Sequence, residues 1–210
     1  MKRFERCMRE YISQGLFNSL SSDESADKLV TLLEECGFKA IACDFDSTMI
    51  QMHSGGYLDP NVDRRVLESV TPDFMAMAKR LKSSDITLFI VTYSDAVHVE
   101  GHARYISGDK MVRAALKYSH CDADIKQVYA YYPRFWDSPS MYKRLGLDGP
   151  MPLGKEYHLK KICSDYNVSL DEIILIDDDM NNCKNAESIG VTALYVTGEG
   201  LKFTELSLLH

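Results

Sequence analysis

Five short apolar runs, with helical patterns in several of the segments before and between them, limit what this chain can fold into more than any other feature of its sequence. The runs cover residues 38–43, 86–91, 127–131, 173–176 and 192–196, and the third is the weakest. Each run is long enough for one strand and is apolar on both faces. Strands of this kind, alternating with helices, indicate a parallel sheet that is covered by helices on both sides.

The segments before and between these runs carry helical patterns. Helices are expected at residues 4–20, 23–36, 72–81 and 156–166. The clearest start is Thr71-Pro72-Asp73, in which Thr caps the helix, Pro occupies its first turn and Asp complements the helix dipole. Ser22 or Asp23 is expected to cap the second helix.

These patterns predict an α/β fold, a Rossmann-like three-layer sandwich with a mainly parallel sheet of about five strands. Residues 1–36 are expected to form an N-terminal helical extension, and residues 37–210 the main domain. In sheets of this kind, ligands bind at the carboxyl ends of the strands. The residues that directly follow each apolar run are therefore the candidates for a functional site.

Polar side chains follow three of the runs. They are Asp44 and Asp46 after the first run, Thr92 at the end of the second, and Asp177, Asp178, Asp179 and Asn182 after the fourth. Three consecutive carboxylates repel one another, so they need a cation or solvent. Carboxylates that meet at one sheet edge suit a hard divalent cation, and Mg²⁺ is the natural choice. Lys155, before the fourth run, is placed to face an anionic substrate.

This set of motifs resembles the haloacid dehalogenase (HAD) superfamily of phosphohydrolases. The DxDx(T/V) motif after an apolar strand is similar to IACDFDST, and the Thr or Ser that closes a strand is similar to LFIVT. The Lys motif is similar to LGKEYHLKKI, and the acidic motif after a strand is similar to ILIDDDMNN. The resemblance runs from about Phe38 to Val196. The usual last acid falls on Asn182, as in the small capless magnesium-dependent phosphatases.

The resemblance implies a phosphatase in which Asp44 attacks phosphorus and forms an aspartyl-phosphate. Asp46 would protonate the leaving oxygen and then deprotonate the hydrolytic water. Mg²⁺ would be held by the carboxylate of Asp44, the backbone carbonyl of Asp46 and the carboxylate of Asp178. Asp177 and Asp179 remain alternatives to Asp178 as metal ligands.

The same resemblance implies that Thr92 and Lys155 bind the phosphoryl oxygens, where electrostatic stabilisation contributes most to phosphoryl transfer. Lys160 remains an alternative to Lys155. Thr48 is expected to brace the loop that follows the nucleophile, and Asn182 is a further candidate site residue.

The segments that follow Thr48 and Tyr131 are too short to fold as a separate cap domain, so the site is expected to be capless and open. An open site favours a large phosphorylated substrate, such as a phosphoprotein. Arg134 and Trp136 follow a predicted strand end and are candidates to line the entrance.

The bulk properties narrow the class of partner. A formal net charge of −7 and the absence of any run of Lys or Arg argue against nucleic acid as a partner. No apolar stretch approaches the roughly 20 residues of a membrane span, so no membrane partner is expected. Six cysteines without a CxxC pair and a charged N-terminus without an apolar segment indicate a reduced, cytoplasmic protein.

Three alternatives stay open. Phosphotransfer to an acceptor other than water would use the same residues, and a catalytically silent HAD-like binding module would keep the fold without turnover. The HxxxH spacing of His98 and His102 could suggest zinc, although without a Cys pair surface histidines are the favoured interpretation.

Overall fold

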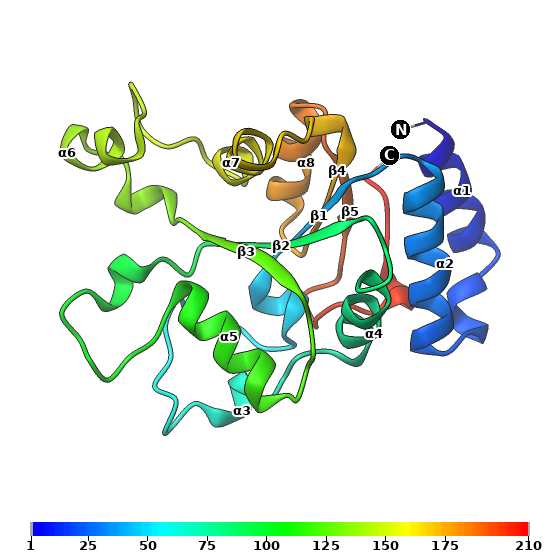
Figure 1. Cartoon of the computed structure of the whole chain (residues 1–210), viewed down its shortest axis with the longest axis horizontal. Helices are drawn as coiled ribbons and strands as arrows, with labels where there is room; N and C mark the ends of the chain where they lie inside the picture. The colour runs from blue at the N-terminus through cyan, green and yellow to red at the C-terminus, as the bar shows by residue number, and fades with distance from the viewer. Residues whose placement is uncertain (1, 210) are drawn as a thin grey trace.

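The computed structural model describes residues 2–209 and contains one five-stranded sheet in which all strands are parallel, in the order β3-β2-β1-β4-β5 (Figure 1). The strands are β1 (Ala40–Cys43), β2 (Thr87–Thr92), β3 (Ile125–Ala130), β4 (Ile173–Asp177) and β5 (Thr192–Tyr195). Each strand falls on one of the five apolar runs. The predicted parallel sheet is therefore confirmed.

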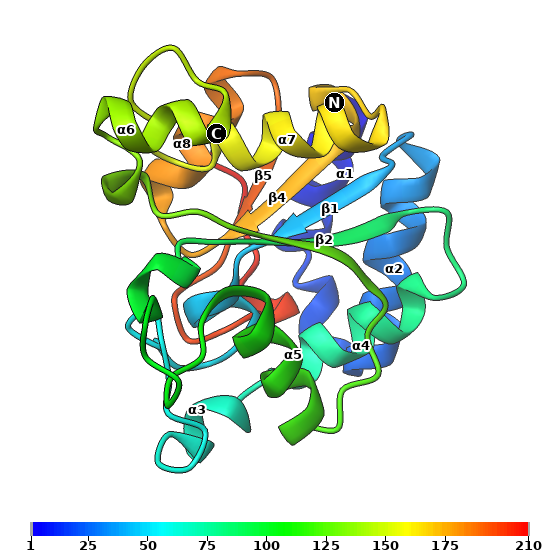
Figure 2. The same ribbon diagram turned by 60° about the vertical axis from the view of Figure 1, so that its left-hand side comes forward.

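Helices cover both faces of this sheet. The α-helices are α1 (Lys2–Ser13), α2 (Ser22–Glu35), α3 (Arg64–Leu67), α4 (Pro72–Leu81), α5 (Gly108–Tyr118), α6 (Pro139–Tyr142), α7 (Glu156–Tyr166) and α8 (Met180–Ser188). Helices α7 and α8 lie on one side of the sheet, and α2, α4 and α5 lie on the other (Figure 2). The predicted three-layer sandwich is confirmed.

Alternate strand residues build two separate cores. Ile41 and Cys43 of β1 belong to the larger core, which includes apolar side chains from α1, α2, α4 and α5. Ala40 and Ala42 point to the other face, where the smaller core takes side chains from α7 and α8. This division follows from the two-residue period of a strand, and it explains why the runs read as apolar throughout.

The first predicted helix, residues 4–20, is too long. Helix α1 ends at Ser13, and Gly15 adopts a left-handed conformation (φ 59°) before a short 3-10 turn. Helix α2 begins close to its predicted start, but its cap is Ser21, which forms a capping box with Glu24. The boundary of helix α4 is as predicted, because Thr71 accepts a hydrogen bond from the Phe74 amide.

Helices α3, α5, α6 and α8 were not among the expected helices, and α5 is the longest of them. It lies between β2 and β3, and its apolar face contributes Met111, Val112 and Ala115 to the larger core. Two of the segments beyond the carboxyl edge of the sheet, 51–71 and 131–155, contain only the four-residue helices α3 and α6 besides short 3-10 turns and isolated β-bridges.

The N-terminal helices pack into the larger core. Phe4 and Met8 are fully buried, and the Phe4 ring contacts the Phe38 ring edge to face, with centroids 5.1 Å apart. The division into a 1–36 extension and a 37–210 domain stays a prediction, but this contact ties α1 to the start of β1. The six cysteines are free thiols, and no helix within residues 2–209 is long and apolar enough to cross a membrane.

We predict that Phe4→Ala lowers the free energy of unfolding by about 3–5 kcal/mol, because it leaves a cavity under the Phe38 ring. Denaturant unfolding followed by circular dichroism measures this change. Arg9→Ala, at an exposed position of the same helix, is the matched control and should change stability by less than about 0.5 kcal/mol. Equal effects of the two substitutions would contradict the packing described for α1.

Candidate active site at the carboxyl edge of the sheet

The candidate site lies where the chain changes direction across the sheet. Strand β1 pairs with β2 on one side and with β4 on the other, and the order of strands reverses there. Open α/β sheets bind ligands at this point, beyond the carboxyl ends of the strands. A pocket of about 360 Å³ opens at this edge, and Asp44, Asp46, Thr92, Lys155 and Asp178 are among its lining residues.

The turn after β1 directs two carboxylates towards the pocket. The Asp44 amide still bonds to Ile176 O at 2.8 Å, so Asp44 continues the sheet. The chain then coils tightly, with Ser47 in the left-handed region (φ 54°). The side chain of Asp46 accepts hydrogen bonds from the Ser54 amide (2.6 Å) and hydroxyl (3.0 Å), which fix its orientation.

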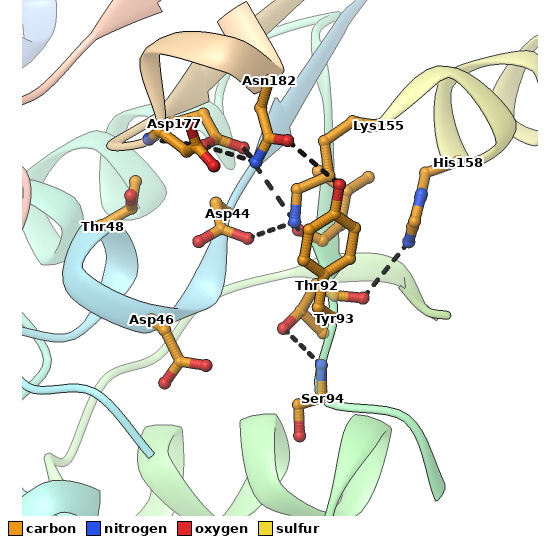
Figure 3. A network of polar contacts seen from close by, with 12 residues as sticks. Asp44, Asp46, Thr48, Thr92, Tyr93, Ser94, Lys155, His158, Asp177 and Asn182 are labelled. Atoms are coloured by element: carbon orange, nitrogen blue, oxygen red, sulfur yellow. Dashed lines mark hydrogen bonds and ion pairs between the residues drawn. The ribbon is translucent and has the colours of Figure 1, made fainter. Parts of the chain in front are cut away.

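Lys155 reaches Asp44 from the helical layer that contains α7. It precedes the first turn of α7, is only 1% exposed, and donates to Asp44 Oδ1 at 2.6 Å and to Val91 O at 3.1 Å (Figure 3). Gly154 makes this approach possible: its φ is +77°, and a Cβ there would lie 2.5 Å from Asn185 Nδ2. Only glycine fits this position without displacing its neighbour.

The charges of this buried cluster depend on one another. Burial raises the pKa of Asp44 well above its ordinary value, and the Lys155 ammonium opposes that rise. Burial alone would lower the pKa of Lys155, but the charges of Asp44 and Asp177 together raise it. Lys155 is therefore protonated at neutral pH, and it supplies the positive charge that a buried carboxylate needs.

The acidic residues after β4 occupy three different environments. Asp177 is fully buried and accepts hydrogen bonds from the Asp179 amide (2.9 Å) and from the Asn182 side chain (3.0 and 3.2 Å). Burial raises its pKa to about 6. Asp178 lines the pocket, and burial raises its pKa as well. Asp179 is exposed and caps α8 through the Asn181 amide.

Three carboxylates meet closely enough to share a cation. One oxygen each from Asp44, Asp177 and Asp178 lies within 4.8 Å of the others, and within residues 2–209 this is the one group of three or more His, Cys, Asp or Glu ligands that could hold a metal. An all-oxygen set of this kind suits a hard divalent cation. The zinc alternative is not supported, because His98 and His102 belong to no such group in the described chain.

The two predicted hydroxyl residues lie at the site and are buried. Thr92 lines the pocket, and its Oγ1 accepts a hydrogen bond from the Ser94 amide at 3.1 Å. Thr48 donates to Asp178 Oδ1 at 3.4 Å, so it links the turn after β1 to the end of β4.

Other candidates lie elsewhere. Lys160 is exposed and pairs with Glu156 on the outer face of α7, so Lys155 is the lysine at the pocket. Arg134 is exposed and is not among the pocket residues. Trp136 is buried under its own segment, where its indole donates to Asp95 at 2.7 Å.

Sequence reasoning missed about half of the residues that line the pocket. They are His53, Gly55, Gly56, Tyr93, His98 and Tyr132. The His98 ring lies very close to Gly56: a Cβ added at Gly56 would lie 2.6 Å from His98 Nε2. The same ring stacks on the Tyr132 ring, with centroids 5.8 Å apart. Tyr93 and Tyr132 each follow a strand end, which is the one sequence signal that could have identified them.

His158 contacts the backbone carbonyl of Thr92. Its ring is fully buried, and its Nε2 lies 3.2 Å from Thr92 O (Figure 3). Burial, together with the charge of Lys155, lowers the pKa of His158 to about 3. The imidazole is therefore neutral throughout the physiological pH range.

The chain has the fold of a known phosphatase domain. No protein-family model and no curated protein matches it. The phosphatase domain in the N-terminal part of BF1531 from Bacteroides fragilis, described as complexed with Mg, is similar with a TM-score of 0.50 and 13% identity, over 81% of this chain and 39% of that chain. This likeness shows the fold alone, and the fold is the one that the resemblance to the HAD superfamily implies.

Two further solved structures are similar. D,D-heptose 1,7-bisphosphate phosphatase from B. bronchiseptica, complexed with magnesium and phosphate, has a TM-score of 0.47 and 18% identity over 76% of this chain and 80% of that chain. A HAD family enzyme from Bacteroides thetaiotaomicron, complexed with magnesium and inorganic phosphate, has a TM-score of 0.41 and 12% identity over 77% of this chain and 96% of that chain.

We predict that His158 makes stability fall with acid. The unfolded chain takes up a proton near pH 6.5 and the folded chain only near pH 3, so this contribution is complete above pH 6.5 and is lost as the pH falls. Between pH 7.5 and pH 5, the wild type should lose about 2 kcal/mol more than His158→Gln, which keeps a donor for Thr92 O. Urea unfolding at both pH values, without added metal, measures the difference. Equal losses would show that His158 titrates normally.

Proposed function

We propose that the chain is a Mg²⁺-dependent phosphomonoester hydrolase of the HAD superfamily that acts through an aspartyl-phosphate on Asp44. The observation that carries this proposal is the buried pair of Asp44 and Lys155 beside Asp178 at the carboxyl edge of the sheet. A cation and a carboxylate cluster in one pocket suit a phosphate dianion and a divalent metal together.

Asp44 has the geometry of a nucleophile. Lys155 holds Oδ1, and among residues 2–209 the other oxygen, Oδ2, has no hydrogen-bond partner. That oxygen attacks phosphorus, the bond to the leaving oxygen breaks, and the phosphoryl group is carried as an acyl phosphate. Water then attacks the same phosphorus and restores the Asp44 carboxylate.

Asp46 serves as the acid and then as the base. Its two bonds from Ser54 orient it towards the pocket, two residues after the nucleophile. It gives a proton to the leaving oxygen in the first step and takes one from the attacking water in the second. A phosphatase needs this residue, whereas a dehalogenase does not.

Lys155 and Thr92 bind the transferring phosphoryl group. An ammonium has three N–H donors, of which Asp44 and Val91 O use two, so the third is left for a phosphoryl oxygen. Thr92 accepts from the Ser94 amide and keeps its own hydroxyl hydrogen to donate. Donors that are already oriented stabilise the charge of the transition state without further reorganisation.

The donor set fits Mg²⁺. Asp44 and Asp178 line the pocket, and the backbone carbonyl of Asp46 lies on the same turn, so we assign these three as ligands. Asp177 is already bonded to Asn182 and to the Asp179 amide, and its role is to hold Asn182. When bound, Mg²⁺ would neutralise the negative charge of the nucleophile and the substrate.

The rim of the pocket favours a large substrate such as a phosphoprotein. Of the exposed large apolar side chains, four lie within two residues of a pocket residue: Met52, Tyr57, Leu153 and Met180. We infer from these positions that they border the charged pocket, and such a border suits a phosphorylated chain with apolar side chains of its own.

We predict that Asp44→Asn abolishes Mg²⁺-dependent hydrolysis of an aryl phosphate, with a loss of at least about 10³-fold in kcat, because an amide cannot form the acyl phosphate. Asp171→Asn, at an exposed position far from the pocket, is the control and should keep full activity. Circular dichroism should show that both variants are folded. Substantial turnover by Asp44→Asn would contradict the proposed mechanism.

The substrate proposal predicts a higher kcat/KM for phosphopeptides with apolar flanking residues than for small sugar phosphates. Met180→Ser, which removes part of the rim, should lower kcat/KM about threefold or more for the peptides and leave it unchanged for the small esters. Steady-state release of phosphate measures both. A clear preference for sugar phosphates would contradict the large-substrate proposal and leave the phosphatase assignment intact.

A further inference from the structure

Tyr93 has a position that the motif comparison does not explain. It follows Thr92 at the end of β2, is half-buried and lines the pocket. Its ring centroid lies 4.0 Å from Lys155 Nζ, and its hydroxyl donates to Asn182 Oδ1 at 3.0 Å (Figure 3). One side chain therefore contacts both the phosphate-binding lysine and the residue that replaces the usual last acid of the fourth motif.

These contacts close a ring of interactions around the ammonium. Tyr93 holds Asn182, the Asn182 amide donates to both oxygens of Asp177, and Asp177 Oδ2 lies 4.0 Å from Lys155 Nζ. The Lys155 ammonium closes the circuit against the Tyr93 ring, and Asp44 binds the same nitrogen at 2.6 Å. The circuit bridges the ends of β2 and β4 across β1.

The ring of Tyr93 restricts where the ammonium can turn. Asp44 Oδ1 and Val91 O use two of its N–H groups, and the aromatic face covers another side of a nitrogen that is almost completely buried. The attraction between a cation and an aromatic face is stronger at a site removed from water than at an exposed site. Lys155 is also among the residues that line the pocket, which is where its third N–H can donate.

We propose that Tyr93 is a positioning residue that aims the free N–H of Lys155 at the phosphoryl subsite. The aromatic ring holds the ammonium, and the bond from the hydroxyl to Asn182 holds the ring. This assignment rests on the proposed function for its effect on turnover, but its effect on anion binding does not require turnover.

The test compares Tyr93→Phe, which keeps the ring, with Tyr93→Leu, which removes it. Calorimetry with inorganic phosphate in the presence of Mg²⁺ gives the Kd, and aryl phosphate hydrolysis gives kcat and KM. We expect Tyr93→Leu to weaken phosphate binding and lower kcat/KM by about tenfold or more, and Tyr93→Phe to change each by less than about threefold. Tyr118→Leu, a half-buried tyrosine of α5, is the control for loss of a ring elsewhere.

Two results would overturn the proposal. One is phosphate binding by Tyr93→Leu within twofold of the wild type, and the other is an equal loss in Tyr93→Phe and Tyr93→Leu. If Tyr93→Leu does not fold, Tyr93→Met, of similar volume and without an aromatic face, takes its place in the same comparison. Phosphate binding that depends on Tyr93 in a protein that hydrolyses no phosphate ester would instead refute the proposed function alone.

Discussion

The ion pair between Lys155 and Asp44 is the interaction on which the rest of the site depends. Two opposite charges are almost completely removed from water, and their mutual attraction and further contacts must offset the free-energy cost of that desolvation. Val91 O and the face of Tyr93 contribute to this at the lysine. The surroundings of the pair are therefore as much a part of the site as the pair itself.

The topology of the sheet brings these groups together. Because all five strands run in the same direction, the ends of β1, β2 and β4 meet at one edge, although they lie far apart in the sequence. Helix α7 reaches the same edge through its first residues, on the side opposite the larger core. The fold thus brings the proposed nucleophile, a hydroxyl, a cation and a carboxylate cluster to one pocket.

Much of this arrangement could be predicted from the sequence, because it depends on local signals. Apolar runs specify strands, and in a parallel sheet the residue after each run lies at the site, so Asp44, Thr92 and Asp178 were found. Contacts between side chains that are distant in the sequence carry no such signal. The ring of Tyr93 over Lys155 and the burial of Trp136 under its own segment therefore needed the structure, and the early end of α1 depended on a single glycine.

Gly154 has a consequence that extends beyond its own turn. Gly154 lies in the turn before α7, close to the Asn185 side chain of α8, and the backbone path there brings Lys155 to Asp44. A methyl group added here would meet the Asn185 side chain of α8, so that side chain or the turn that carries Lys155 would have to move. The position of the charge beside Asp44 thus depends in part on an uncharged residue outside the pocket lining.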